Sequence, residues 1–231
     1  MKVALAERLL AAREAGRRAC LLRFLKTGEE ALVIEGELVV GPDLPDGVLD
    51  AIERAHRRDR STTIETAAGP VFLQVFNPPL RLIVVGAVHI AQALVPMAAL
   101  TGYAVTVIDP RRGFATAERF PNVSLLDAWP DEAMESLAPD LRTAVVTLTH
   151  DPKLDDPALD VALRSEAFYI GALGSKRTHA ARLERLRALG HAPEALARIH
   201  GPAGLDIGAE SPAEIAVSVL AQMTQVLRKE G

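Results

Sequence analysis

The fold of this chain is decided by residues 82–91, which read Leu82-Ile83-Val84-Val85-Gly86-Ala87-Val88-His89-Ile90-Ala91. The first four residues form a continuous apolar run, which predicts a strand that is covered on both faces. Gly86 permits a tight turn after that strand, and the apolar-rich residues 91–100 predict a helix. Strand, glycine turn and helix in this order are typical of the first unit of a doubly wound, nucleotide-binding sheet.

The same alternation continues to the end of the chain. Further strands are predicted at 104–108, 124–127, 143–148 and 168–171. Further helices are predicted at 130–137, 155–164, 175–189 and 212–228. Strands that alternate with helices through short links indicate a parallel sheet with helices on both faces. We therefore expect a Rossmann-like α/β domain over residues 80–231.

A different pattern precedes this domain. Helices are predicted at 3–18 and 48–58, and short strands at 20–25, 31–34, 37–40, 62–66 and 71–75. The segment Asn77-Pro78-Pro79 is the expected linker, because successive prolines stiffen the backbone and remove hydrogen-bond donors. We therefore expect a small α+β domain over residues 1–77.

Composition and charge exclude several classes of protein. The 231 residues include 26 basic and 30 acidic side chains, and the net charge of −4 disfavours a nucleic-acid partner. Cys20 is the one cysteine, which excludes an internal disulfide framework and a Cys-rich metal site. Its apolar neighbours indicate that it packs as a small hydrophobe. No uncharged apolar run reaches the roughly 18 residues of a membrane span, and the N-terminal run is too charged for a signal peptide. We expect a cytoplasmic protein without a membrane partner.

Polar residues follow the predicted strands of the second domain. They are His89 after the first strand, Asp109 after the second, His150 and Asp151 after the fourth, and Gly174-Ser175-Lys176-Arg177 after the fifth. Ligands of open α/β sheets bind outside the carboxyl ends of the strands. These segments are therefore expected to converge on one crevice.

The segment after the fifth strand has the chemistry of an anion site. Ser175 is a good N-cap, and the free amides and dipole of the following helix favour an anion beside Lys176 and Arg177. A phosphate or pyrophosphate group would fit there. The alternative is a plain capped helix with solvated cations.

A dinucleotide site is a second possibility with mixed support. Asp109 lies 23 residues after Gly86, close to the spacing of a ribose-binding acid. Val88, however, stands where a glycine normally lets the pyrophosphate approach the backbone, and its side chain should obstruct that approach. Asp109 could instead cap the turn that follows it. Arg111 and Arg112 could meet a phosphate or face solvent.

The histidines at the strand ends admit two interpretations. His150 and Asp151 could form an acid/base pair, or His150 could be hydrogen-bonded scaffolding. Adjacent residues on a strand point apart, so the pair is not expected to hold one ion, and no metal site is predicted. His89 begins a helix, whose dipole disfavours its protonation, so it should be neutral at pH 7.

A long loop over residues 200–211 precedes the last helix. Ser211, Pro212 and Glu214 form a strong helix start, so Glu214 is expected to serve as a capping residue. Asp206 and Glu210 have no such local explanation. They are therefore candidates for contact with a ligand.

Four motifs together resemble the XdhC/CoxI family of accessory proteins for molybdenum hydroxylases such as xanthine dehydrogenase. They are the segments 86–90 (GAVHI), 147–151 (TLTHD), 169–177 (YIGALGSKR) and 204–216 (GLDIGAESPAEIA). The resemblance covers roughly residues 80–228. The family's usual first turn reads Gly-x-Gly-His, whereas this chain has Val88 before His89. A Gly-Gly-Cys motif and a Ser-x-Pro-Arg stretch, which members normally carry, do not occur in this sequence.

The resemblance implies a cytoplasmic maturation factor that binds molybdenum cofactor, as molybdopterin or its dinucleotide, and holds it transiently. It implies help with sulfuration of the cofactor and its insertion into an apo-enzyme. The implied partners are the molybdenum hydroxylase, the cofactor-sulfurating cysteine desulfurase and a second copy of the chain. The candidate cofactor-binding residues are Gly86, His89, Asp109, His150, Asp151, Gly174, Ser175, Lys176, Arg177, Asp206 and Glu210.

Two other functions stay open at this point, and no catalytic residue is assigned. Gly86, Ala91 and Asp109 would suit an NAD(P)-dependent oxidoreductase, against which Val88 counts. Val88 and the missing cysteine motif would also suit a non-catalytic interaction protein that keeps the Rossmann core as a scaffold.

Overall fold

A computed structural model describes residues 3–111 and 113–229 of the protein. The chain forms two compact units, and the division falls between Pro78 and Pro79. The division therefore lies inside the proline segment that the sequence marks as a linker.

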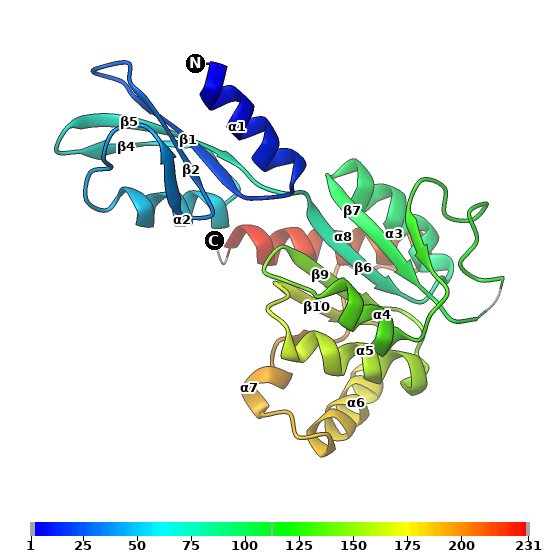
Figure 1. Ribbon diagram of the computed structural model, residues 1–231. Helices are drawn as coiled ribbons and strands as arrows, with labels where there is room; N and C mark the ends of the chain where they lie inside the picture. The colour runs from blue at the N-terminus through cyan, green and yellow to red at the C-terminus, as the bar shows by residue number, and fades with distance from the viewer. Residues whose placement is uncertain (1–2, 112, 230–231) are drawn as a thin grey trace. The chain divides into compact units, whose positions relative to one another are not determined.

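The first unit is an antiparallel sheet with a helix on each face (Figure 1). Its strands run in the order β3-β2-β1-β5-β4. The elements are α1 (Val3–Glu14), β1 (Ala19–Phe24), β2 (Glu30–Ile34), β3 (Glu37–Val40), α2 (Val48–Arg57), β4 (Thr62–Thr66) and β5 (Gly69–Phe76). Alternate residues of β1 point to opposite faces, so Leu21 packs in the cluster of α1 while Cys20 and Leu22 pack in the cluster of α2.

Cys20 is fully buried in this unit, as predicted for a small hydrophobe. Burial raises the pKa of its thiol to about 12, because the thiolate would lose its hydration. The thiol therefore stays protonated and apolar in the folded protein.

The second unit confirms the predicted Rossmann-like fold. Its described residues form a six-stranded sheet in the order β11-β10-β9-β6-β7-β8, and every neighbouring pair is parallel. The strands are β6 (Leu80–Val85), β7 (Tyr103–Ile108), β8 (Ser124–Leu126), β9 (Thr143–Thr147), β10 (Tyr169–Ala172) and β11 (Ile199–His200). The helices are α3 (His89–Leu100), α4 (Pro130–Leu137), α5 (Pro152–Arg164), α6 (Lys176–Ala188), α7 (Pro193–Leu196) and α8 (Pro212–Lys229).

Helices cover both faces of this sheet (Figure 1). Leu82 and Val84 of β6 pack with α3 and α8 on one face, whereas Ile83 and Val85 pack with α4, α5 and α6 on the other. Burial on both faces explains why β6 is a continuous apolar run rather than an alternating one.

The structure differs from the sequence prediction at several elements. Helix α5 begins at Pro152 rather than at residue 155, because Asp151 caps it and proline is favoured in the first turn. Helix α1 ends at Glu14 rather than at residue 18, because Gly16 turns the chain in a left-handed conformation with φ of 65°. The short elements α7 and β11 have no counterpart in the prediction, since four-residue and two-residue segments carry too little periodicity to be recognised.

Within the described ranges, none of the helices is both long and apolar enough to traverse a bilayer.

Candidate functional site

The strand order places a switch point between β6 and β9. The chain first builds outward from β6 through β7 to β8, and then continues on the other side with β9, β10 and β11. Ligands of such sheets bind outside the carboxyl ends of the strands at this reversal. The segments that leave these ends, 86–89 after β6 and 148–151 after β9, therefore border the candidate site.

The turn after β6 depends on its glycine. Gly86 has φ of 107°, and a Cβ atom at that position would lie 2.5 Å from Cγ2 of Thr149. Val88 needs no such freedom, because its φ is −90°, and its side chain is half-buried against the core beside α3 and α8. His89 is exposed at the first residue of α3. Gly86 thus brings the ends of β6 and β9 into direct contact.

Asp109 at the end of β7 is 1% exposed, and the protein itself uses both of its carboxylate oxygens. Oδ2 accepts a hydrogen bond from the Ala87 amide at 2.8 Å, and Oδ1 accepts one from the Arg111 amide at 3.0 Å. The Arg111 guanidinium donates to both oxygens, at 2.9 and 2.7 Å. Burial alone would raise the pKa of Asp109, but these hydrogen bonds outweigh it and lower the pKa. Asp109 therefore ties the first turn to the chain that follows β7.

Arg111 supplies the positive charge of this group. Its hydrogen bonds to Asp109 raise its pKa, and the charges of Asp151 and Asp155 raise it further. Its guanidinium also lies over the Phe114 ring, 4.2 Å from the ring centre. Arg112, the other arginine of the predicted phosphate pair, lies outside the described residues.

The loop after β9 is organised by Asp155, which the sequence prediction missed. The Asp155 carboxylate accepts hydrogen bonds from the Thr149 hydroxyl at 2.6 Å and from the His150 amide at 3.1 Å. His150 is exposed and has φ of 62°, an uncommon left-handed conformation. Asp151 caps α5 by accepting a hydrogen bond from the Lys153 amide at 2.9 Å. In the sequence Asp155 is only the first residue of a predicted helix. Its part in organising the loop becomes visible only from its burial in the structure.

The loop after β10 leads into α6 through the expected cap. The Ser175 hydroxyl accepts a hydrogen bond from the Thr178 amide at 3.1 Å, and Gly174 before it has φ of 143°. Lys176 and Arg177 are exposed, and within residues 3–111 and 113–229 neither has an ion-pair partner. The first-turn amides of α6, its dipole and these two cations together favour an anion.

Arg182 lies beneath this loop, and the sequence prediction did not select it either. Its side chain is 2% exposed and approaches Asp155 at 3.6 Å. It donates a hydrogen bond to the Leu173 carbonyl at 2.8 Å. Burial lowers the pKa of Arg182 and raises that of Asp155, because each charge loses hydration. An arginine inside a polar helix pattern gives no sequence signal of burial.

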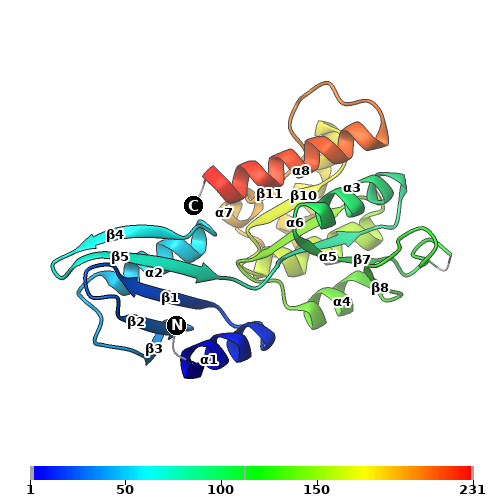
Figure 2. The ribbon, with the colours of Figure 1, turned by 90° about the horizontal axis from the view of Figure 1, so that it is seen from above.

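The loop before α8 arches outward in Figure 2, and hydrogen bonds join its two ends to α8. The Gly204 amide donates to Oε1 of Gln222 at 2.8 Å, and Glu214 accepts hydrogen bonds from the Ser211 and Glu210 amides at 2.8 and 2.9 Å. The predicted capping role of Glu214 is therefore confirmed. Asp206 and Glu210 are exposed on this loop. Among the described contacts, none joins their side chains to the residues at the ends of β6, β9 and β10.

Two further features bear on the kind of site. Over the part of the chain that the structure describes, no three His, Cys, Asp or Glu side chains gather as metal ligands.

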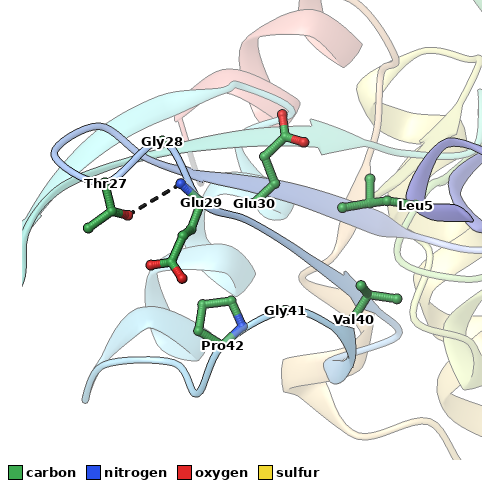
Figure 3. A pocket seen from close by; sticks show the side chains of 8 residues that line it. All are labelled: Leu5, Thr27, Gly28, Glu29, Glu30, Val40, Gly41 and Pro42. Atoms are coloured by element: carbon green, nitrogen blue, oxygen red, sulfur yellow. Dashed lines mark hydrogen bonds between the residues drawn. The ribbon is translucent and has the colours of Figure 1, made fainter. Parts of the chain in front are cut away.

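The first unit holds a separate hollow of about 770 Å³ (Figure 3), where a local hydrogen bond from the Glu29 amide to Thr27 shapes the turn. Its lining residues are Leu5, Thr27, Gly28, Glu29, Glu30, Val40, Gly41 and Pro42. None of these belongs to the motifs of the second unit.

Comparison with known proteins places the second unit in a family. Residues 82–223 match the XdhC Rossmann domain. A crystal structure described as a xanthine dehydrogenase from Bacillus halodurans has 25% identity to this chain and a TM-score of 0.75, and it aligns with 100% of this chain and 66% of its own.

Three curated relatives match about two thirds of the chain. The uncharacterized protein YqeB of Escherichia coli is 39% identical over 158 residues, 68% of this chain and 29% of its own length. A probable xanthine dehydrogenase component of Bacillus subtilis is 35% identical over 160 residues, 69% of this chain and 46% of its own. The molybdenum cofactor insertion chaperone PaoD of Escherichia coli is 34% identical over 151 residues, 65% of this chain and 41% of its own. The chain thus spans less than half the length of each of these relatives.

The matched segment contains the first turn with Gly86, the loops after β9 and β10, and the loop before α8, and it makes up more than half of the chain. This chain therefore belongs to the XdhC family, whose Rossmann domain forms its second unit.

Proposed function

We propose that this protein binds molybdenum cofactor and assists its maturation and insertion into a molybdenum hydroxylase such as xanthine dehydrogenase. The observation that carries the proposal is the capped, cationic N-terminus of α6, which follows β10, the strand next to β9 at the switch point of an XdhC Rossmann domain. The names of two relatives, a cofactor insertion chaperone and a xanthine dehydrogenase component, support the same assignment.

The donor set fits the phosphate end of a pterin cofactor. In the proposed complex, the first-turn amides of α6 with Ser175, Lys176 and Arg177 hold the phosphate. Gly174, with φ of 143°, makes the turn that leads into them. Gly86 keeps the turn after β6 compact, next to His89. Asp109 acts on the ligand indirectly, by holding that turn.

The pterin end needs hydrogen-bond acceptors for its ring N–H groups. The exposed side chains of His150, Asp151, Asp206 and Glu210 would supply them. When bound, the cofactor would supply the metal centre of the target hydroxylase, and this chain would bind and protect it before insertion.

The NAD(P)-oxidoreductase alternative gains no support from the site. A ribose would have to compete with the Ala87 amide and with Arg111 for the oxygens of a buried Asp109. Breaking hydrogen bonds to a buried charge costs about 1.5–3 kcal/mol each.

The proposed partners are the apo-hydroxylase, a cysteine desulfurase that sulfurates the cofactor, and a second copy of this chain, all in the cytoplasm. A pull-down with the purified chain checks them individually. Recovery of hydroxylase chains by a protein without any bound small molecule would favour a non-catalytic interaction protein instead.

The binding proposal is checked by purifying the protein from a host that makes molybdenum cofactor, oxidising the bound pterin and measuring its fluorescence. We expect pterin in the wild type and a roughly tenfold lower affinity in Lys176→Ala, the loss of one charge-assisted contact. Arg187→Ala removes a cation from the other end of α6 and is the matched control. Absence of pterin from the wild type, together with no binding on titration, would reject the proposal.

A further inference from the structure

Helices α5 and α6 are joined by two Asp–Arg pairs in very different surroundings. Asp156 and Arg185 meet near the surface, with Nη2 3.0 Å from Oδ1 and 40% of the arginine side chain exposed. Asp155 and Arg182 meet in the interior at 3.6 Å, each with only 2% of its side chain exposed. The first is a surface pair on its arginine side, although only 12% of the Asp156 side chain is exposed. The second has neither partner exposed and needs another explanation.

The buried pair spans the two loops that border the candidate site. Asp155 holds the loop after β9 through the Thr149 hydroxyl at 2.6 Å and the His150 amide at 3.1 Å. Arg182 holds the loop after β10 through the Leu173 carbonyl at 2.8 Å. A continuous chain of polar contacts therefore runs from His150 to the segment that leads into the N-terminus of α6.

The backbone at one end of this chain of contacts is strained. His150 has φ of 62°, and a left-handed conformation costs a non-glycine residue free energy unless its surroundings enforce it. The Asp155 carboxylate accepts the amide hydrogen of that same residue. The contact therefore helps to hold His150 in a conformation that it would otherwise leave.

Stability alone does not account for the pair. Within the described residues, Nε and Nη1 of Arg182 are buried and make no hydrogen bond. Burying two charges costs hydration that their attraction repays only when the remaining donors are satisfied, and well-packed apolar residues are often as stable. A buried, incompletely bonded ion pair is better explained by what it positions.

We infer that Asp155 and Arg182 are positioning residues that couple the loop 149–151 to the loop 173–177, so that an oxyanion at the N-terminus of α6 is sensed at His150. The sensing of an anion rests on the proposed function, whereas the mechanical coupling of the two loops does not. The coupling can therefore be measured on the ligand-free protein.

Amide hydrogen exchange measures the coupling directly. We expect the His150 and Thr149 amides to exchange about tenfold faster in Arg182→Met, relative to the Leu148 amide, which donates to Val85 within the sheet at 2.9 Å. Arg185→Met cuts the surface pair between the same helices and should leave this ratio unchanged. Equal ratios in the two variants would overturn the inference.

A double-mutant cycle separates coupling from general loosening. Asp155→Asn should raise the exchange rates of the same two amides. The double variant Asp155→Asn/Arg182→Met should raise these rates no further than the larger of the two single changes does. If the fold-change in exchange rate of the double variant equals the product of the two single fold-changes, the residues act independently, which contradicts the inference. If Arg182→Met does not fold, Arg182→Lys keeps the charge without the planar fork, and it should exchange at a rate between wild type and Asp155→Asn.

Inorganic pyrophosphate is the probe for the ligand half. At saturation, the amide resonances of residues 174–177 and of residues 149–150 should both shift in the wild type. In Arg182→Met the shifts should be confined to residues 174–177. Shifts at both loops in Arg182→Met would overturn the coupling. If pyrophosphate moves no wild-type resonance, the phosphate site of the proposed function is rejected, and the exchange data still decide the coupling.

Discussion

The Asp109 carboxylate accepts a hydrogen bond from the Ala87 amide at 2.8 Å, and so holds the turn after β6 from the end of β7. The same carboxylate is bonded by the backbone and side chain of Arg111. An acid at this position can bind a ribose in a dinucleotide enzyme. Here the Ala87 amide and Arg111 already occupy the carboxylate, which supports our proposal that a charged ligand binds at the N-terminus of α6 instead.

Asp109→Asn should lower the free energy of unfolding by about 2 kcal/mol at pH 7, the value of hydrogen bonds to a buried charge. The folded pKa of Asp109 is lowered, so its contribution is complete above the unfolded pKa of about 4 and is lost as pH falls through the folded pKa. Urea unfolding at pH 7 and at pH 3 measures both differences. A gap between variant and wild type that stays constant down to pH 3 would contradict the assignment.

Gly86→Ala should destabilise the protein because the new Cβ atom meets Cγ2 of Thr149 and because alanine resists φ of 107°. Thr149→Ser removes that methyl group and keeps the hydroxyl that donates to Asp155. The double variant should therefore regain the part of the stability that Gly86→Ala loses through the steric contact. It should still lack the part lost through backbone strain, about 1–2 kcal/mol. Thermal unfolding of the two single variants and the double variant measures both parts. If the stability losses of the two single changes simply add in the double variant, the contact between the new Cβ atom and Cγ2 of Thr149 does not contribute to the loss.

His150→Gly should be more stable than His150→Ala by about 1 kcal/mol, because glycine adopts the left-handed conformation without steric cost. The side chain of His150 is exposed, so neither change removes a packed group. Chemical denaturation of the two variants side by side provides the comparison. Equal stabilities would show that the loop relaxes and that His150 is not held under strain.

Substitutions of Ser175 can separate helix capping from anion binding. Ser175→Ala should cost about 1 kcal/mol of stability through loss of the hydrogen bond from the Thr178 amide. Ser175→Asp keeps a capping oxygen, so its stability should stay near that of the wild type while its negative charge repels pyrophosphate. Denaturation and calorimetric titration check the two effects. Undiminished pyrophosphate binding by Ser175→Asp would place the anion elsewhere.

Cys20 should react with thiol reagents only when the first unit opens. Its pKa is raised to about 12 by burial, so at pH 8 the thiolate is scarce and out of reach. The labelling rate should follow urea concentration in parallel with unfolding, and Cys20→Ala should abolish it. Rapid labelling of the native protein would contradict the packing of β1 against α2.

The sequence predicted most of the fold because its signals are local. The apolar run at residues 82–85 predicts a doubly covered strand, and Ser175 and Ser211 mark helix starts through bonds within one turn. The family could likewise be identified from short motifs at strand ends. In each case the neighbours that decide the structure lie within a few residues in the chain.

Only the tertiary structure decided how the strand-end residues are used. The hydrogen bond of Asp109 to Ala87 spans 22 residues, and the pairing of Asp155 with Arg182 spans two helices. An aspartate at a strand end looks the same in sequence whether it faces a ligand or an amide. Whether such a charge is free or satisfied depends on burial and on distant partners, which no local pattern records.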